Sequence, residues 1–315
     1  MRMSELEGSL ASSGLEAVTF GDAEKRLFIV PELHGRIFVA LEGKVFHNVN
    51  PQAFRPSKAG SEFLNPGGDS LWCAPEGTRW GFFYDAGRWR VPEALAKCQY
   101  KIVRIEKDRL TIRSSFSLRN ALGIEIPLES TRVIRQLAHS KGVGYETRDT
   151  LRYLGEKPLS YEDARVVPWT LSQYPASGTT RAFFPFPSGA RLKDFYEPFG
   201  DRLKMLGESV ELDTDGRKKG QIGISPEVPM ISFRDSASGL VVTRKSQKFL
   251  RTRRYIDIAD RPPTEDYNAD FPTRYSIYNG DNSILELESC GAMSAILEPG
   301  VKITLVTENE HYFER

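Results

Sequence analysis

YSIYNGDNSILELES, residues 275–289, contains two runs with β-strand character on either side of an Asn-Gly turn at 279–280. Asn and Gly supply the positive φ values that tight turns require. In the second run, Glu286 and Glu288 lie two positions apart, and side chains with this spacing point to the same face of a strand. The leucines next to them point to the opposite face. The stretch therefore predicts a strand with one apolar and one acidic face, and acid/base chemistry is to be sought on the acidic face.

Similar runs, separated by turn signals, recur along the whole chain. Many alternate between apolar and polar residues, which is the pattern of strands with one buried face. Recurring strands with little helical periodicity predict an all-β fold of stacked antiparallel sheets rather than a helical or doubly wound fold. The candidate strands are 17–20, 27–29, 36–41, 44–49, 100–106, 109–118, 124–134, 142–153, 160–173, 180–184, 221–225, 230–235, 239–244, 275–278, 283–289 and 302–308.

Two longer irregular stretches, Glu62–Leu95 and Tyr174–Lys204, are rich in aromatic residues, Pro and Gly. Long irregular segments of compact domains are usually functional when their composition is not that of a disordered chain. We expect them to form the walls of a binding cleft. The 315 residues are expected to form one domain, and residues 1–14 are either part of it or a flexible N-terminal extension.

Charge and hydropathy exclude several classes of partner. The chain has 43 basic and 42 acidic residues, so no overall field draws it to nucleic acid or to an anionic membrane. No segment has the roughly 18–20 uninterrupted apolar residues of a membrane span, and the N-terminus has no apolar signal-peptide core. These observations predict a cytoplasmic protein with a small-molecule partner. A secretory signal trimmed from the chain is the alternative.

The cysteines and histidines do not form a metal-binding pattern. Cys73, Cys98 and Cys290 are odd in number and far apart, which argues against a zinc site or a disulfide framework. Their expected place is the apolar core. His34 and His47 are separate from each other and from any Cys/Asp cluster. The sequence therefore indicates no metal and no organic cofactor.

The segment GDSLWCAPE, residues 68–76, combines a tight turn, two acids and a tryptophan. Such mixtures suit carbohydrates, because apolar sugar faces stack on aromatic rings while charged groups pair with hydroxyls. Asp69, Trp72 and Glu76 are therefore candidate substrate-binding residues. The structural alternative is that Asp69 caps the turn and Trp72 fills the core.

Three residues of other strands are further candidates for the cleft. Arg36 follows Gly35 at the start of a strand, and a buried Arg requires an anionic partner or a ligand. Trp169 and Gln173 are each two positions from Leu171, so these side chains share one strand face. They line the groove or pack in the core.

The segment RTRR, residues 251–254, with Lys245 and Lys248 nearby, is the one basic concentration in the chain. Basic runs of this kind usually protect a solvated edge from strand pairing. The alternative is contact with an acidic sugar such as a uronate.

Several segments, in order along the chain, resemble the galactose mutarotase-like superfamily, which has the aldose 1-epimerase fold, and in particular its uncharacterised bacterial branches. The resembling segments are VPELHGRI (30–37), NVNP (48–51), GGDSLWCAPEG (67–77), PWTLSQ (168–173), LELES (285–289) and LEPG (297–300). The resemblance covers nearly the whole chain. It implies an antiparallel β-supersandwich with a concave, open carbohydrate site on one face.

The resemblance also implies residue roles. In mutarotases a glutamate on a late strand removes the anomeric hydroxyl proton, and a histidine protonates the ring oxygen. Glu288, followed by Ser289, is at the place of that glutamate, and Arg36 resembles an early basic residue that contacts sugar hydroxyls. The acid histidine of an Asn-Pro-His type segment is missing, because none of the four histidines lies in such a segment.

Two residues are candidates for the missing acid. His34 lies beside Arg36, and the unperturbed histidine pKa is in the working range of an acid. Lys219, in a basic turn before a strand, is similar in position to a lysine that projects into the cavity in related bacterial families; a solvated turn is the alternative. Glu286 is expected beside Glu288 in the same site.

Together these features predict a carbohydrate-active protein, with a mutarotase-like or related isomerisation that uses Glu288 as general base. The alternative is a non-catalytic carbohydrate-binding or regulatory module that lacks the acid histidine, so the question of enzyme activity stays open. A polysaccharide lyase or hydrolase is a third interpretation, for which Tyr278 is the candidate tyrosine. The expected partner is a small sugar or an oligosaccharide, and no oligomeric state is indicated.

Overall fold

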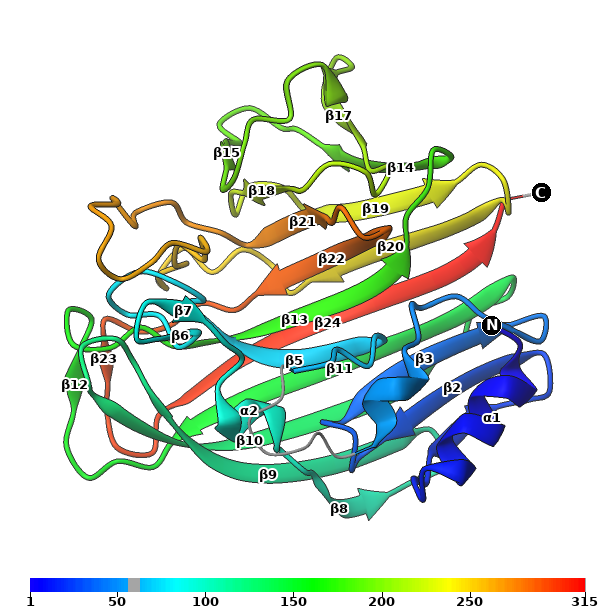
Figure 1. Ribbon diagram of the computed structural model, residues 1–315, viewed down its shortest axis with the longest axis horizontal. Helices are drawn as coiled ribbons and strands as arrows, with labels where there is room; N and C mark the ends of the chain where they lie inside the picture. Colours follow the sequence, from blue (N-terminus) through cyan, green and yellow to red (C-terminus); the bar gives the residue numbers. More distant parts are fainter. Residues whose placement is uncertain (56–62, 315) are drawn as a thin grey trace.

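Two large antiparallel β-sheets stack face to face in the computed structural model, which describes residues 1–55 and 63–314 (Figure 1). The first sheet has the strand order β1-β2-β3-β5-β13-β22-β21-β18-β15, with β4 paired to β3. Its strands are β1 (Val18–Gly21), β2 (Lys25–Val30), β3 (Arg36–Leu41), β4 (Lys44–Val45), β5 (Asp69–Ala74), β13 (Val167–Pro175), β15 (Leu192–Asp194), β18 (Gly220–Ile224), β21 (Tyr275–Asn279) and β22 (Ile284–Cys290).

The second sheet has the order β16-β17-β14-β19-β20-β24-β11-β10-β9-β8. Its strands are β8 (Lys101–Ile105), β9 (Arg109–Arg119), β10 (Glu125–Leu137), β11 (Gly142–Tyr153), β14 (Thr180–Pro185), β16 (Leu203–Met205), β17 (Ser209–Asp213), β19 (Met230–Asp235), β20 (Leu240–Ser246) and β24 (Lys302–Phe313). The short elements are α1 (Met3–Ser12), η1 (Pro51–Phe54), β6 (Tyr84–Asp85), β7 (Arg88–Trp89), α2 (Glu93–Ala96), β12 (Leu159–Ser160), η2 (Gly200–Arg202) and β23 (Ile296–Leu297). The predicted all-β, antiparallel sandwich is confirmed.

Alternation in the sequence explains the orientation of the long strands. In β10, every second residue from Ile126 to Ile134 is buried, while the residues that alternate with them are partly exposed. A slip of one residue would turn this buried set toward solvent, so burial of one face fixes the register. β10 accordingly pairs with β9 and β11 over nearly its whole length.

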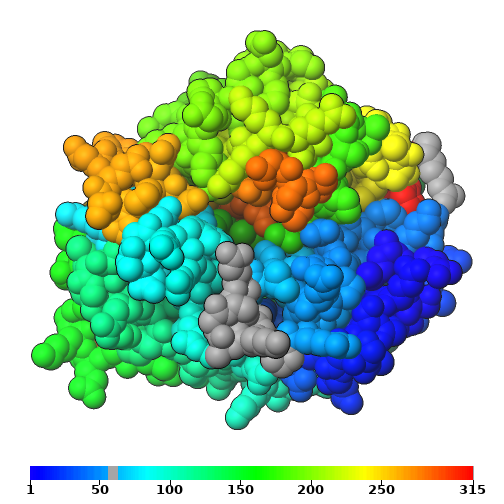
Figure 2. Space-filling model, viewed as in Figure 1, coloured from blue at the N-terminus to red at the C-terminus, as the bar shows by residue number. Residues whose placement is uncertain are grey.

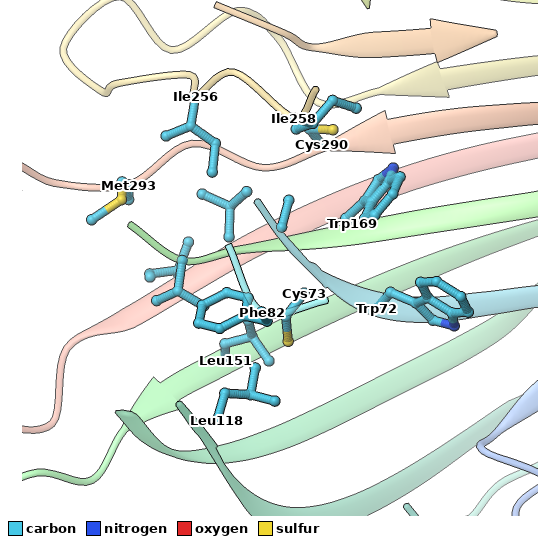
Figure 3. Close-up of a cluster of buried hydrophobic side chains, with 14 of the residues drawn as sticks. Trp72, Cys73, Phe82, Leu118, Leu151, Trp169, Ile256, Ile258, Cys290 and Met293 are labelled. Atoms are coloured by element: carbon cyan, nitrogen blue, oxygen red, sulfur yellow. The ribbon is translucent and has the colours of Figure 1, made fainter. Parts of the chain in front are cut away.

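The apolar core lies mainly between the two sheets. Figure 3 shows part of one cluster, in which Leu118 and Leu151 of the second sheet lie near Cys73 of the first. A smaller cluster lies on the outer face of the first sheet, where α1 packs Leu6 and Leu10 against β2 and β3. The outer face is thus covered at the β2–β3 end, and the adjoining strands carry the candidate site.

A buried polar network also joins the sheets. Asp69 on β5 pairs with Arg244 Nη1 at 2.8 Å and with Arg132 Nη2 at 3.2 Å, and all three side chains are fully buried. Ser172 and Tyr145 donate hydrogen bonds to the same carboxylate. Asp69 was a candidate substrate-binding residue, but its side chain points between the sheets because it has the opposite strand parity from Trp72. The structure therefore places it in a structural ion network.

Several expected segments differ in the structure. Residues 1–14, with a flexible extension as one alternative, contain α1, whose Leu6 and Leu10 are buried. The stretch Tyr174–Lys204, expected to be irregular apart from the candidate strand 180–184, contains that strand as β14 and also β15. The part of Glu62–Leu95 from residue 63 onward includes β5 and the β6–β7 hairpin. Glu62 itself lies outside the described residues. Among the described residues, no helix has the length and apolar character that crossing a membrane requires.

Candidate functional site

The outer face of the first sheet gathers polar side chains from β13, β22, β21 and β18. Glu288 is paired with Leu171 on one side and Ser276 on the other. Glu286 is paired in the same way with Gln173 and Tyr278. Side chains of paired residues share a face, so these positions form two adjoining rows. Figure 2 shows this side of the molecule hollowed between the cyan segment after β5 and the orange segment near residue 280, with atoms of the sheet at the floor.

Glu288 lies at the floor of this site. Trp169 Nε1 donates a hydrogen bond to its carboxylate at 3.0 Å, and Gln221 Nε2 lies 3.2 Å from both of its oxygens. Its side chain is 1% exposed. Burial raises the pKa of Glu288 well above its usual value, and the negative charges of Glu286 and Glu76 raise it further. A carboxyl group of this kind takes up and releases protons nearer neutral pH than a solvated one.

Glu286 is the second carboxyl group. Gln173 Nε2 donates a hydrogen bond to its Oε1 at 2.5 Å. Burial raises the pKa of Glu286, while this hydrogen bond and the charge of Arg36 oppose the rise. Arg36 is 1% exposed, donates through Nη1 to the carbonyl of Gly67 at 2.6 Å, and has its pKa lowered to about 9 by burial. The guanidinium is thus a desolvated cation beside the acidic strand.

Glu76, which follows β5, is the third carboxyl group of the cluster. Its Oε1 accepts a hydrogen bond from Trp89 Nε1 at 2.7 Å. Burial raises the pKa of Glu76 well above its usual value, and the charge of Asp260 adds to this effect. Phe83 lies between Trp72 and Trp89, with ring centroids 5.1 and 6.1 Å away. A stack of three aromatic rings therefore adjoins this carboxyl group.

The rim of the site comes from four segments far apart in the sequence. Tyr84 and Tyr196 donate hydrogen bonds, each 2.7 Å long, to the two oxygens of Asp260. Lys219 Nζ lies 4.0 Å from the centre of the Tyr196 ring. Its charge also lowers the pKa of Glu76, so the two groups are near one another.

Several polar atoms at the floor have no hydrogen-bond partner within the described part of the chain. They are Nε and Nη2 of Arg36, Oε1 of Gln173, Oε1 of Gln221 and Oγ of Ser276. All four side chains are more than nine-tenths buried. Buried polar groups are normally satisfied, so a collection of donors and acceptors without partners indicates a place where a polar ligand supplies them.

Residues 11–312 match the model of a family described as "Family of unknown function (DUF6786)". The chain belongs to this family. No curated protein matches it.

Three solved structures share the fold of this DUF6786 protein. The Slr1438 protein from Synechocystis sp. PCC 6803 is 12% identical, with a TM-score of 0.61 and coverage of 95% of this chain and 96% of that one. A galactose mutarotase-like protein from Lactobacillus casei ATCC 334 is 10% identical, with a TM-score of 0.59 and coverage of 94% and 100%. A candidate aldose 1-epimerase from Escherichia coli K12 is 12% identical, with a TM-score of 0.58 and coverage of 96% and 100%. The fold is therefore galactose mutarotase-like, as the sequence resemblance implied, in a branch without an assigned function.

The structure brings together most of the residues that the sequence singled out. The sheet floor holds Glu286, Glu288, Gln173, Trp169, Tyr278 and Arg36, while Glu76 and Lys219 lie beside it. Trp72 is paired with Trp169 on the outer face of the first sheet and packs against Phe83 and Trp169, so it supports the site from the side.

His34 does not join the cluster in this DUF6786 chain. Its Nε2 lies 2.7 Å from the carbonyl of Ala96, and a carbonyl only accepts, so this nitrogen carries the hydrogen. Burial, together with the charge of Arg36, lowers the pKa of His34 to about 4. The imidazole is therefore neutral near pH 7, which argues against it as the acid.

Sequence reasoning missed five residues of the site. They are Tyr84, Trp89, Tyr196, Gln221 and Asp260. Gln221 had a usable signal, because it is the polar first residue of a predicted strand whose isoleucines point to the other face. The three aromatic residues come from the two aromatic-rich stretches that were expected to wall the cleft. No group of three or more His, Cys, Asp or Glu side chains in the described ranges has an arrangement that could hold a metal ion.

Proposed function

We propose that this DUF6786 protein binds a neutral sugar over β13, β22, β21 and β18 and interconverts its anomers with Glu288 as general base. The observation that supports the proposal most is the coincidence of buried carboxyl groups and unpartnered polar atoms on one sheet face. Sugar hydroxyls both donate and accept, so they match a floor that offers carboxylates, amide oxygens and a guanidinium together. The aromatic stack beside Glu76 suits the apolar face of a sugar ring.

The proposed reaction needs one base and one acid. Glu288 takes the proton of the anomeric hydroxyl, the bond between the anomeric carbon and the ring oxygen breaks, and a donor protonates the ring oxygen. The open-chain carbonyl then rotates, and the reverse steps close the ring in the other anomer. A base with a raised pKa is well matched to proton transfer near neutral pH.

Glu76 is the proposed proton donor. Its raised pKa keeps a proton on the carboxyl group at higher pH than a solvated glutamate would, which allows it to act as an acid. Two carboxyl groups would then replace the glutamate and histidine of a mutarotase. Lys219, whose Nζ lies over the Tyr196 ring, is the second candidate donor.

The charges of the site favour a neutral substrate. Four carboxyl groups, those of Glu76, Glu286, Glu288 and Asp260, face two cations, Arg36 and Lys219. A uronate or a sugar phosphate would bring further negative charge to carboxyl groups that are already difficult to ionise. We therefore expect neutral hexoses or amino sugars to bind better than acidic sugars.

Two measurements test the proposal. A thermal-shift screen against neutral hexoses, amino sugars, uronates and sugar phosphates identifies the ligand, because a ligand at 100 times its Kd stabilises by about 2.7 kcal/mol. Polarimetry from a pure anomer then measures turnover: Glu288→Gln should lower the rate about 10²- to 10⁴-fold, while the exposed Glu156→Gln should not change it. Equal rates for Glu288→Gln and wild type would exclude Glu288 as the base.

A non-catalytic sugar-binding module is the second candidate function. It is favoured by the position of His34, since no histidine among the described residues contacts the Glu288 carboxylate. Such a module would bind sugars in the thermal-shift screen, but the anomers would interconvert at the uncatalysed rate. Glu76→Gln separates the two functions, because it would lower turnover in the enzyme and change only affinity in the module.

A further inference from the structure

A second recessed surface lies away from the candidate site, where β20 ends beside the middle of β24 in the second sheet. It consists of two hollows of about 440 and 310 Å³ that share Glu227 and Phe249. We call this surface the basic groove. Its lining residues are Tyr161, Pro226, Glu227, Pro229, Lys245, Ser246, Gln247, Lys248, Phe249, Arg251, Arg253, Arg254, Tyr255, Pro272, Arg274, Val306 and Glu308. None of them belongs to the cluster around Glu288.

The groove carries a marked excess of positive charge. Six of its lining residues are cationic and two, Glu227 and Glu308, are acidic. Lys245, Lys248 and three arginines between 251 and 254 are exposed. Within the described ranges, none of these five side chains forms an ion pair. The positive charge of the groove is therefore not neutralised by the chain itself.

Arg274 adds a buried charge at the floor. It is 4% exposed, and its guanidinium donates to the carbonyls of Pro226, Val228, Ser246 and Gln247 and to the hydroxyl of Ser246. These contacts fix the two segments that form the groove walls. No carboxylate among residues 1–55 and 63–314 pairs with Arg274, so a buried cation without a counter-ion lies under the cationic surface, where it favours an anion.

We propose that the basic groove binds a chain of acidic sugars, such as an oligouronate. Two joined hollows provide an elongated surface, which suits a chain better than a single anion. The lysines and arginines would pair with the carboxylates of the chain, while Glu227 and Glu308 would accept its hydroxyl hydrogens.

A nucleic acid fits the groove less well. The aromatic rings of the groove already have cationic partners. The guanidinium of Arg254 lies 4.7 Å from the centre of the Tyr161 ring, and that of Arg251 lies 5.7 Å from the centre of the Phe249 ring. Binding of single strands depends on such rings being open for base stacking. The two acidic side chains would also repel closely spaced phosphates, whereas sugar hydroxyls would satisfy them.

The test is isothermal titration of the full chain with tetragalacturonate, with neutral maltotetraose as comparison. Tetragalacturonate should bind more tightly, and its affinity should fall as salt rises. The double variant Lys248→Glu/Arg251→Glu should lower the affinity at least tenfold. Lys101→Glu/Lys107→Glu makes the same charge change at exposed positions on and beside the β8 edge and should leave the affinity within twofold.

The same titration has outcomes that overturn the proposal. They are an affinity no greater than that for maltotetraose, an equal loss in both double variants, or tighter binding of an oligonucleotide of equal charge. Glu288→Gln separates this proposal from the sugar site: it should leave tetragalacturonate binding unchanged whether or not Glu288 is catalytic. Loss of binding in that variant would place the anion over β22 instead.

Discussion

Replacement of Asp69 by Asn tests whether this carboxylate stabilises the fold or binds substrate. Asp69 is fully buried between Arg132 and Arg244, and with Asp149 these residues form a neutral set of two acids and two cations. Asn has nearly the same shape but no charge, so the variant keeps the packing and leaves one guanidinium without compensation. Removal of one partner of a buried ion pair costs about 3–5 kcal/mol.

The melting temperature converts this cost into a measurable shift. The entropy of unfolding is about 2.1 cal/mol/K per residue, which corresponds to roughly 0.7 kcal/mol/K for a chain of 315 residues. Asp69→Asn should therefore lower the melting temperature by about 5–8 °C. Circular dichroism measures the shift, and Asp281→Asn, at an exposed position, is the matched control.

The pH dependence gives a second readout of the same variant. Burial opposes ionisation of Asp69, but the charges of Arg244 and Arg132 outweigh it and lower the pKa. The contribution of a carboxylate with a lowered pKa is present above its unfolded pKa and is lost as pH falls through the folded value. The difference between wild type and Asp69→Asn should thus be complete at pH 6 and shrink below about pH 4. A variant as stable as wild type at pH 6, with weaker sugar binding, would refute the structural role.

Three further predictions concern other parts of the chain. Leu6→Ala should lower the free energy of unfolding by about 2–5 kcal/mol, whereas Leu64→Ala, at a 45% exposed side chain, should change it little; equal small effects would mean that α1 is not docked. Glu288→Gln should be more stable than wild type at pH 8, and the gain should disappear toward pH 4, because the raised pKa makes the ionised form of Glu288 unfavourable in the fold. Thermal unfolding across this pH range measures the difference, and a gain that grows toward pH 4 would contradict the reasoning. The three cysteines are buried and should react with a thiol reagent much more slowly in the native chain than in denaturant, so equal rates would contradict their burial.

The sequence was most informative where one strand face is buried and the other is not. The bounds predicted for 142–153 and 230–235 agree with β11 and β19, which largely alternate between buried and more exposed residues. The bounds predicted for 36–41 agree with β3, a fully buried strand that an apolar run marks. β5 is also fully buried, but it was missed because it neither alternates nor has such a run, since it begins with Asp69 and Ser70. α1 was missed because few apolar residues mark its packed side and it is stabilised by contacts with β2 and β3 rather than by its own sequence.

The candidate site was predictable to the extent that its residues lie on one strand. The spacing of Glu286 and Glu288 fixes their common face without knowledge of the fold. Gln221 and Asp260 enter the site through strand order and loop packing, since β18 reaches β22 only by way of β21. The strand pattern gives the face of Gln221, but contacts between segments far apart in the sequence leave no local pattern, so only the structure brings Gln221 and Asp260 to the site.

The central strands of the first sheet carry polar residues on both faces. This explains why the sequence predicted Asp69 to be a substrate-binding residue although its side chain lies between the sheets. On β13, Ser172 faces the second sheet and bonds to Asp69, while its neighbour Gln173 faces outward and bonds to Glu286. On β22, Ser289 likewise faces the second sheet and accepts a hydrogen bond from Arg244, while Glu288 faces outward and accepts one from Trp169. A shift of one residue would exchange the ion network for the carboxyl cluster and leave both without partners. The inner network therefore fixes the strand register on which the outer site depends, so a variant that weakens the network should disturb the site as well as the stability.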